Sequence, residues 1–231
     1  MKRIYKHVAV AAGEGGFGVT LDGRPVRTPG RAPLTVASRA LAEAIAEEWR
    51  AQGDTVEPET MPLTRLASTA LDLVPARRPA IVGEAAAYAG TDLVCYRAEA
   101  PVELVARQQA AWQPLLDWAA GRYGAALAVT TGVVPRPQPP EALAALRRAV
   151  EAEDDLSLVA LHAATVAAGS LVIALALLEG RIDAAEAFAL SQLDETFQIE
   201  RWGEDSEATR RRAALRDDLA HAARFHRLHR G

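Results

Sequence analysis

The residues best suited to chemistry lie in an acidic block around Trp202. Glu200, Glu204 and Asp205 gather there, where a predicted helix ends at Gly203. Two carboxylates beside an aromatic ring could serve as general acid and general base in a glycosidase-like site. A Trp among charged side chains is equally typical of a protein interface. The block therefore has two interpretations, a small hydrolase that uses Glu200 and Asp205 or a surface that binds a partner protein.

A third interpretation comes from the arginines of the predicted last helix, which covers residues 205–228. Asp205 is a favourable N-cap for this helix, because its carboxylate can accept hydrogen bonds from free N–H groups of the first turn. The arginines could bind an anionic partner such as a nucleic acid. They are interleaved with acids and apolar residues, however, and the net charge of the chain is −4, so we expect no nucleic-acid partner. These arginines are Arg210, Arg211, Arg212, Arg216, Arg224, Arg227 and Arg230.

A glycine-rich segment from Gly13 to Gly18 matches the pattern G-x-G-x-x-G. In a dinucleotide site these glycines precede a helix whose N-terminus binds the pyrophosphate. Here residues 19–21 continue an alternation of apolar and polar side chains, which predicts a strand. No lysine occurs after Lys6, so the lysine of kinase and Walker-type phosphate sites is missing. We therefore expect a hairpin turn and no cofactor.

Metal ligands and activated nucleophiles are sparse in this sequence. Cys95 is the only cysteine, so no internal disulfide is possible and a reducing compartment is expected. No glycine-rich or basic sequence surrounds Cys95, which favours a small buried side chain over a reactive thiolate. His226 and His229 could share a helix face, but no Cys, Asp or Glu stands at zinc-site spacing from them. We expect no catalytic residue and no metal.

The elements that must position these residues begin with strands. Residues 8–10 and 17–21 alternate with the period of two that is typical of half-buried strands. Asp22 and Gly23 between apolar runs favour a tight turn, because both central positions of such a turn need a positive φ. A further short strand is expected at residues 34–36. Together these segments predict a small antiparallel sheet.

From Ser38, a suitable N-cap, the apolar period becomes helical, and Gly53 is expected to end the first helix. Helical patterns then continue through the rest of the chain, with Pro114 expected to kink or divide one long helix. The sequence thus predicts an α+β fold, in which a small N-terminal antiparallel β domain is followed by a C-terminal all-α helical bundle. We place the mainly β domain, with its following helices, at residues 1–75 and the all-α domain at residues 76–231.

Length and composition suit a folded, water-soluble protein. The 231 residues are 50% hydrophobic and 24% charged, an ordinary balance for a globular chain long enough to bury a core. No secretory signal is recognisable at the start. The most apolar run, residues 166–178, is shorter than the roughly 20 residues that span a bilayer. We expect a cytoplasmic monomer without membrane insertion.

Eight blocks, in order and covering roughly residues 3–228, resemble the family of chaperones that hold the alpha subunit of the ATP synthase catalytic sector before assembly. No single block is decisive, whereas the ordered set is specific. The blocks are Arg3–Lys6, Leu21–Pro29, Ala44–Gly53, Met61–Thr64, Thr91–Ala98, Trp112–Trp118, Gly169–Ala176 and Asp194–Asp205.

The resemblance implies a two-domain chaperone without catalytic activity that binds the unassembled alpha subunit and prevents its aggregation. It also implies a bacterial member, since mitochondrial members carry a targeting extension. The family's functionally sensitive acidic position lies in the block from Asp194 to Asp205. We therefore interpret the acidic block as the partner-binding surface, made of Glu195, Glu200, Trp202, Glu204 and Asp205.

Overall fold

The structure, a computed structural model, describes residues 2–132, 134, 136–203 and 205–231, and it divides into two compact units. The N-terminal unit contains Met1–Arg78, Asp154–Ala160 and Arg224–Gly231, and the helical unit contains Pro79–Glu153 and Leu161–Ala223. Each unit therefore combines segments that are distant in sequence. The domain boundary expected between residues 75 and 76 stays a prediction.

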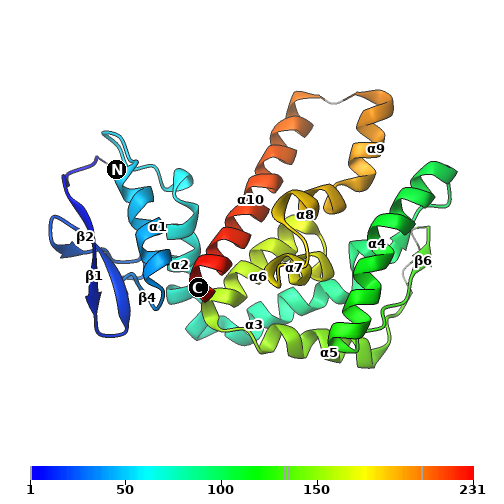
Figure 1. Cartoon of the computed structure of the whole chain (residues 1–231), viewed down its shortest axis with the longest axis horizontal. Helices are drawn as coiled ribbons and strands as arrows, with labels where there is room; N and C mark the ends of the chain where they lie inside the picture. The colour runs from blue at the N-terminus through cyan, green and yellow to red at the C-terminus, as the bar shows by residue number, and fades with distance from the viewer. Residues whose placement is uncertain (1, 133, 135, 204) are drawn as a thin grey trace. The chain divides into compact units, whose positions relative to one another are not determined.

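A four-stranded antiparallel sheet in the N-terminal unit begins with a hairpin (Figure 1). β1 (Val8–Gly13) pairs with β2 (Gly16–Leu21) in a register that places Gly13 opposite Gly16. The glycine-rich segment is therefore the predicted hairpin turn, and a strand follows it. Gly16 has a φ of 132°, and a Cβ there would lie 2.4 Å from the carbonyl oxygen of Val36. Only glycine fits this position, because both the backbone conformation and the available space exclude a side chain.

A second turn leads from β2 into β3 (Arg24–Pro25), and β4 (Thr35–Val36) pairs with the other end of β2. Asp22 and Gly23 have φ values of 48° and 79°, as the tight-turn prediction requires. The Oδ1 atom of Asp22 accepts a hydrogen bond of 2.8 Å from the backbone N–H of His7. This bond, more than any other contact, lowers the pKa of Asp22 and ties the turn to the segment before β1.

α1 (Arg39–Arg50) packs against the sheet (Figure 1). Ser38 is its N-cap, as predicted, and the hydroxyl oxygen accepts a hydrogen bond of 3.3 Å from the N–H of Leu41. The prediction that Gly53 ends the helix is wrong. The helix ends at Arg50, and its C-cap Ala51 has a right-handed φ of −70°, so no left-handed glycine is needed there. The buried face consists of Leu41, Ala42, Ala44, Ile45 and Ala46.

The first turn of α2 (Pro62–Asp72) has no side-chain cap of its own. The carboxylate of Glu48, from α1, replaces it and accepts hydrogen bonds from the N–H groups of Leu63 at 2.7 Å and Thr64 at 2.8 Å. An anion at this position satisfies two free donors and interacts favourably with the helix dipole. Glu48 therefore fixes the spacing between α1 and α2.

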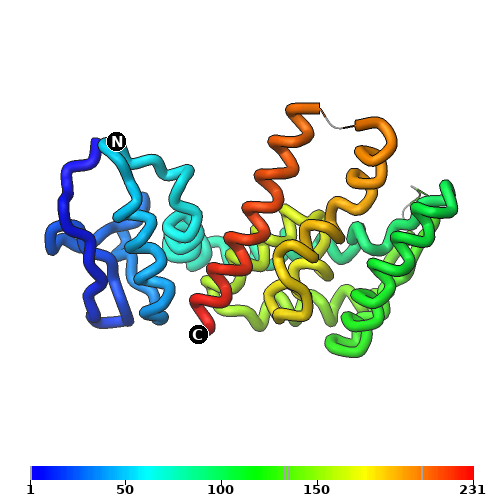
Figure 2. Tube along the Cα trace, turned by 45° about the horizontal axis from the view of Figure 1, so that its top comes forward, coloured from blue at the N-terminus to red at the C-terminus, as the bar shows by residue number. Residues whose placement is uncertain are grey.

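The helices after α2 confirm the predicted α+β class, with strands first and helices after them (Figures 1 and 2). The long helix α4 continues through Pro114, so the proline does not divide it. The bounds are Val74–Ala87 for α3, Val102–Tyr123 for α4, Pro140–Glu151 for α5, Asp155–Ala168 for α6, Leu171–Leu178 for α7, Ala184–Ser191 for α8, Leu193–Trp202 for α9 and Ser206–Arg230 for α10. Two short strands, β5 (Tyr96–Arg97) and β6 (Thr130–Thr131), pair in parallel.

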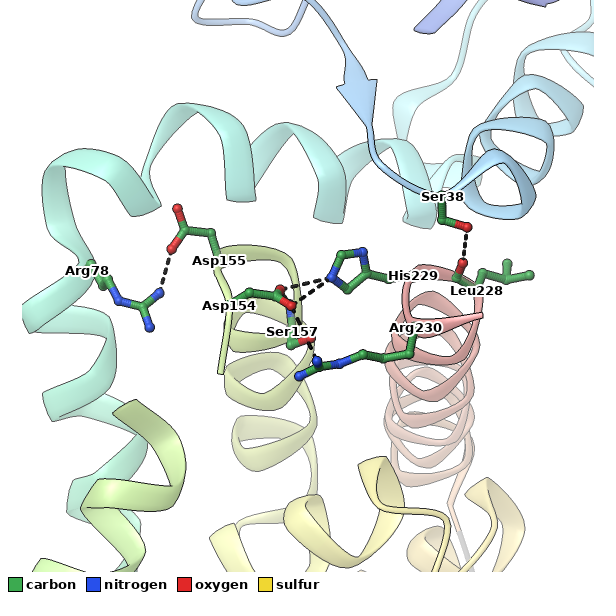
Figure 3. Close-up of polar contacts among 8 residues, drawn as sticks. All are labelled: Ser38, Arg78, Asp154, Asp155, Ser157, Leu228, His229 and Arg230. Carbon is green, nitrogen blue, oxygen red and sulfur yellow. Dashed lines mark hydrogen bonds and ion pairs between the residues drawn. The ribbon is translucent and has the colours of Figure 1, made fainter. Parts of the chain in front are cut away.

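Polar contacts join the three segments of the N-terminal unit (Figure 3). The carboxylate of Asp154 accepts a hydrogen bond of 2.9 Å from the N–H of Ser157 and lies 2.9 Å from Nε2 of His229. The hydroxyl of Ser38 donates to the carbonyl oxygen of Leu228. The unit is therefore held together by contacts between residues more than 70 positions apart in the chain.

A buried carboxylate organises the start of α7 in the helical unit. Asp92 is fully buried and accepts hydrogen bonds from the N–H groups of Val94 at 3.2 Å and Val172 at 3.1 Å. Burial raises the pKa of Asp92 to about 6, although hydrogen bonds from Ser170, Val172 and Val94 oppose the rise. The helix it contacts is almost wholly apolar and buried, so Asp92 supplies the polar contacts at its N-terminus.

Candidate functional site

The acidic block occupies α9 and the junction between α9 and α10. Its helix ends at Trp202, and Gly203, with a φ of 83°, donates its N–H to the carbonyl oxygen of Ile199. A residue with a side chain would be strained in this conformation. Glu204, one of the predicted site residues, lies outside the residues that the structure describes.

Asp205 begins α10 as the predicted N-cap. Its Oδ1 atom accepts hydrogen bonds of 2.8 Å from the N–H groups of both Glu207 and Ala208. The bond from Ala208, followed by the bond from Glu207, lowers the pKa of Asp205. The side chain is therefore a charged acceptor that supports the helix, and it still faces solvent.

Glu200 is paired with a cation from a different helix. Its Oε2 atom lies 2.7 Å from Nη1 of Arg107 on α4. The guanidinium carbon of Arg107 lies 5.2 Å from the centre of the buried Phe197 ring, and that of Arg201 lies 4.2 Å from the same ring. Both contacts are within the range of cation–π attraction. α4 and α9 are thus joined by an ion pair placed over an aromatic ring.

Glu195 and its neighbour connect α9 to α10. The Oε1 atom of Glu195 lies 3.4 Å from Nη2 of Arg211, and Nη2 of Arg212 donates a hydrogen bond of 3.0 Å to the hydroxyl of Thr196. Two of the arginines that could have bound a nucleic acid are therefore directed toward α9. Their contacts favour a role in holding the acidic block in place.

Trp202 is the one large apolar side chain of the proposed site, and it is exposed in the part of the chain that the structure describes. Its exposed fraction is 76%, which is unusual for a large aromatic side chain in a folded domain. Acids surround it along the chain, and Glu200 and Glu195 are held in place by arginines. The structure therefore places an exposed Trp at the end of a helix whose carboxylates have fixed positions.

The hydrolase interpretation requires a hollow that encloses Glu200 and Asp205. Four cavities among the described residues are lined by other side chains, and neither Glu200 nor Asp205 contributes to these four. Glu200 is occupied by Arg107 and Asp205 by the first turn of α10. The two carboxylates are therefore occupied by structural partners, and this arrangement disfavours general acid and base catalysis.

The sequence interpretation missed the residues that support the site from α4. Gln108 accepts a hydrogen bond of 2.7 Å from the N–H of Ala98 and donates one of 2.8 Å to Oδ1 of Asp194. Gln108 and Asp194 belong to segments far apart in the chain, and periodicity carries no information on such pairings. A single buried polar residue on a predicted apolar face, here Gln108, was the only available signal.

Cys95 is fully buried, as predicted. Burial first, and the negative charge of Asp92 second, raise the pKa of the thiol to about 12. Among the described residues, no group of three or more His, Cys, Asp or Glu side chains is arranged to hold a metal ion. Within the same part of the chain, no helix combines the length and apolar character needed to cross a membrane.

The comparison with known proteins places this geometry in context. Residues 2–120 match the family model described as ATP12 chaperone protein. The protein named atp12, mitochondrial, from Schizosaccharomyces pombe is 25% identical over 214 residues, which cover 87% of this chain and 74% of that protein.

Solved bacterial structures are more similar still. The Atp12 of Paracoccus denitrificans is 45% identical and superimposes with a TM-score of 0.94, covering 99% of this chain and 98% of that one. An aspartate-to-lysine mutant of the same protein has the same identity and TM-score and covers 99% and 97%. The Atu1473 protein of Agrobacterium tumefaciens, described as a chaperone, is 44% identical with a TM-score of 0.91, covering 98% of this chain and 85% of that one.

Proposed function

The chain belongs to the ATP12 family of ATP synthase assembly chaperones, and we propose that it binds the unassembled alpha subunit of the catalytic sector and prevents its aggregation. An alpha subunit that has not met its partner exposes apolar surface, and such patches favour aggregation. A chaperone that covers this surface must later be displaced. Its affinity therefore has to exceed the costs of association by only a modest margin.

The observation that carries the proposal is the exposed Trp202 at the acidic end of α9. Trp is the residue most enriched at positions that dominate binding energy in protein interfaces. Its indole can insert into an apolar depression of the client, while fixed carboxylates around it pair with basic residues of the client. We propose that the binding surface consists of Glu195, Glu200, Trp202, Glu204 and Asp205.

The proposed role requires no catalysis. The carboxylates of Glu200 and Asp205 are occupied by an arginine and by a helix N-terminus. Their fixed positions suit recognition, because pre-ordered side chains lose less entropy when a partner binds. We therefore propose a cytoplasmic binding protein that acts as a monomer and without a cofactor.

Co-purification tests the proposal directly. The tagged protein is expressed with either the alpha or the beta subunit of the same organism's ATP synthase, and the soluble complex is isolated. We expect the alpha subunit to be retained, to stay soluble, and to be released when beta subunit is added. Retention of neither subunit would overturn the proposed function.

Charge reversal of Glu200 tests the proposed surface, and Glu151 provides a matched control. Both side chains are 48% exposed and both pair with an arginine, Glu200 with Arg107 at 2.7 Å and Glu151 with Arg147 at 2.8 Å. Glu200→Lys should weaken capture of the alpha subunit about tenfold, whereas Glu151→Lys should not. Loss of one exposed ion pair costs at most about 1 kcal/mol of stability, so both variants should fold. The aspartate-to-lysine mutant of the Paracoccus protein keeps the family fold, which supports this design.

A further inference from the structure

The N-terminal unit contains a cavity of about 660 Å³ that none of the contacts described so far explains. Its volume is within the range of sites that enclose a ligand larger than one side chain. Four apolar residues from three segments of the chain line it and are almost completely buried. These residues are Val26, Leu34, Val56 and Met61.

One face of α2 forms a wall of the cavity. Its lining residues are spaced three and four positions apart, which places them on a single side of the helix. The opposite side is packed into the core by Leu63, Ala67 and Ala70. The lining residues of this face are Thr64, Arg65, Ser68, Thr69, Asp72 and Leu73. α2 is therefore anchored by one face while the other borders an open space.

Asp72, the only acid among the described residues that line the cavity, is hydrogen-bonded within the protein. Asp72 accepts hydrogen bonds from the hydroxyl of Thr28 at 2.5 Å and from the N–H of Gly30 at 2.7 Å. A Cβ at Gly30 would lie 2.6 Å from the Asp72 carboxylate, so glycine lets the loop approach this closely. Both carboxylate oxygens thus hold the loop that forms the facing wall.

Thr64, also on this wall, donates its hydroxyl to Oε2 of Glu48 at 2.7 Å, whereas the other donor side chains of the wall have no partner among the described residues. No hydrogen bond or ion pair involves the side chains of Arg65, Ser68 or Thr69 in the part of the chain that the structure describes. Arg27, on the facing loop, donates from Nη1 to the carbonyl oxygen of Arg31 at 2.8 Å, which leaves its charge unbalanced. The cavity is therefore apolar inside, with two guanidinium groups and two hydroxyls available around it.

We propose that this cavity binds an extended segment of the client polypeptide, in which a large apolar side chain is followed or preceded by an acidic residue. The apolar side chain fills the space above Val56 and Met61, and the carboxylate meets the guanidinium groups of Arg65 and Arg27. The hydroxyls of Ser68 and Thr69 donate to backbone carbonyl oxygens of the segment.

The combination of an apolar lining with two cations favours a segment that carries both an apolar and an acidic side chain. A purely anionic ligand would leave the apolar lining unfilled, and a purely apolar one would leave two cations unpaired. Leu73, 46% exposed at the edge of the cavity, extends the apolar surface outward, as a segment longer than one residue requires. That the polypeptide is the ATP synthase alpha subunit rests on the proposed function.

The test uses fluorescein-labelled 12-residue peptides that overlap along the whole alpha subunit, titrated with the full chain and followed by fluorescence anisotropy. Ser68→Trp fills the cavity. We expect at least one peptide with an apolar residue beside Glu or Asp to bind, and Ser68→Trp to weaken it about ten- to a hundredfold, which corresponds to the burial of one large apolar side chain.

A charge variant keeps the test independent of how Ser68→Trp folds. Arg65→Glu should weaken the acidic peptide several-fold and make its binding less sensitive to salt. It should not weaken the same peptide with its acid replaced by lysine. Arg24→Glu is the matched control, since Arg24 is exposed in the same unit and does not line the cavity. We expect this variant to bind like the unmodified protein.

Two results would overturn the proposal. One is that no peptide binds, and the other is that binding is equal for Ser68→Trp, Arg65→Glu and the unmodified protein. Intact alpha subunit retained equally by all three proteins would overturn the cavity proposal while the proposed function stands. Peptide binding that follows the variants as expected, without retention of the intact subunit, would support the cavity and overturn the proposed function.

Discussion

Nε2 of His229 lies 2.9 Å from Oδ2 of Asp154, so the end of α10 and the start of α6 share one carboxylate (Figure 3). Burial by itself would raise the pKa of Asp154. Hydrogen bonds from the N–H of Ser157 and from His229, with the charge of Arg230, outweigh it and lower the pKa below its usual value. The contact therefore stabilises the ionised carboxylate in the folded state.

Removing this contact should destabilise the protein in a pH-dependent way. We expect His229→Ala to lower the free energy of unfolding by about 1 kcal/mol near pH 7, because the pair is partly exposed. A carboxylate with a lowered pKa contributes stability above its unfolded value, and this contribution is lost as the pH falls below about 4. Urea denaturation at pH 7 and pH 3.5 measures the difference. His221→Ala, on the same helix, should have little effect, and equal losses at both pH values would contradict the prediction.

The contribution of Asp92 to the free energy of unfolding should have the opposite pH dependence. Its pKa is raised to about 6 by burial, so the folded state binds a proton that the unfolded chain releases near pH 4. The stability from this group is therefore fully present below about pH 4 and is lost as the pH rises through 6, on the order of 3 kcal/mol. Relative to Asp92→Asn, the unmodified protein should lose stability over this window. Asp22, whose pKa is lowered, provides the control, since comparison with Asp22→Asn should show the reverse sign.

Cys95 should be unreactive in the folded protein. The thiol is fully buried and its pKa is raised to about 12, so very little thiolate exists at pH 8 and reagents have no access. We expect iodoacetamide to alkylate the native protein at least about a hundredfold more slowly than the chain unfolded in urea. Mass spectrometry of quenched samples measures both rates. Similar rates would show that the region around Cys95 opens readily.

Substitution of two tryptophans of the helical unit should distinguish an effect on client binding from an effect on the stability of the fold. Trp202 is largely exposed, so Trp202→Ala should change the free energy of unfolding by no more than about 0.5 kcal/mol and should weaken capture of the alpha subunit. Trp112 is fully buried and donates from Nε1 to the carbonyl oxygen of Leu190 at 3.0 Å. Trp112→Ala should cost about 3–5 kcal/mol. Unchanged capture by a folded Trp202→Ala variant would exclude Trp202 from the binding surface.

Local patterns predicted the local structure of this fold well. Alternation in β1 and β2, the positive φ positions at Asp22 and Gly23, and the Ser38 cap all depend on neighbouring residues, and all are confirmed. Pro114 was expected to kink or divide a helix, and α4 continues through it undivided. Packing of α4 on both sides of a proline can outweigh one lost hydrogen bond, and the sequence does not report that packing.

The candidate site was predicted in composition but not in arrangement. The acidic composition of α9 and the N-cap at Asp205 could be predicted from the sequence. The N–H groups that Asp205 caps belong to residues two and three positions further along the chain. The pairing of Glu200 with Arg107 spans 93 positions, and only the fold brings these residues together. The cavity beside α2 was likewise unreadable, because its walls come from separate segments.

The order in which the ribosome makes the chain has a consequence for the two units. Every residue of the helical unit has been synthesised once Ala223 is added, whereas the N-terminal unit also needs Arg224–Gly231. The sheet and its helices are therefore made first and completed last. Until residues 224–231 have been synthesised, the sheet lacks part of its own unit. Incompletely folded chains are prone to misassembly during this period. A chaperone built in this way gains its finished N-terminal unit only after its helical unit has been synthesised.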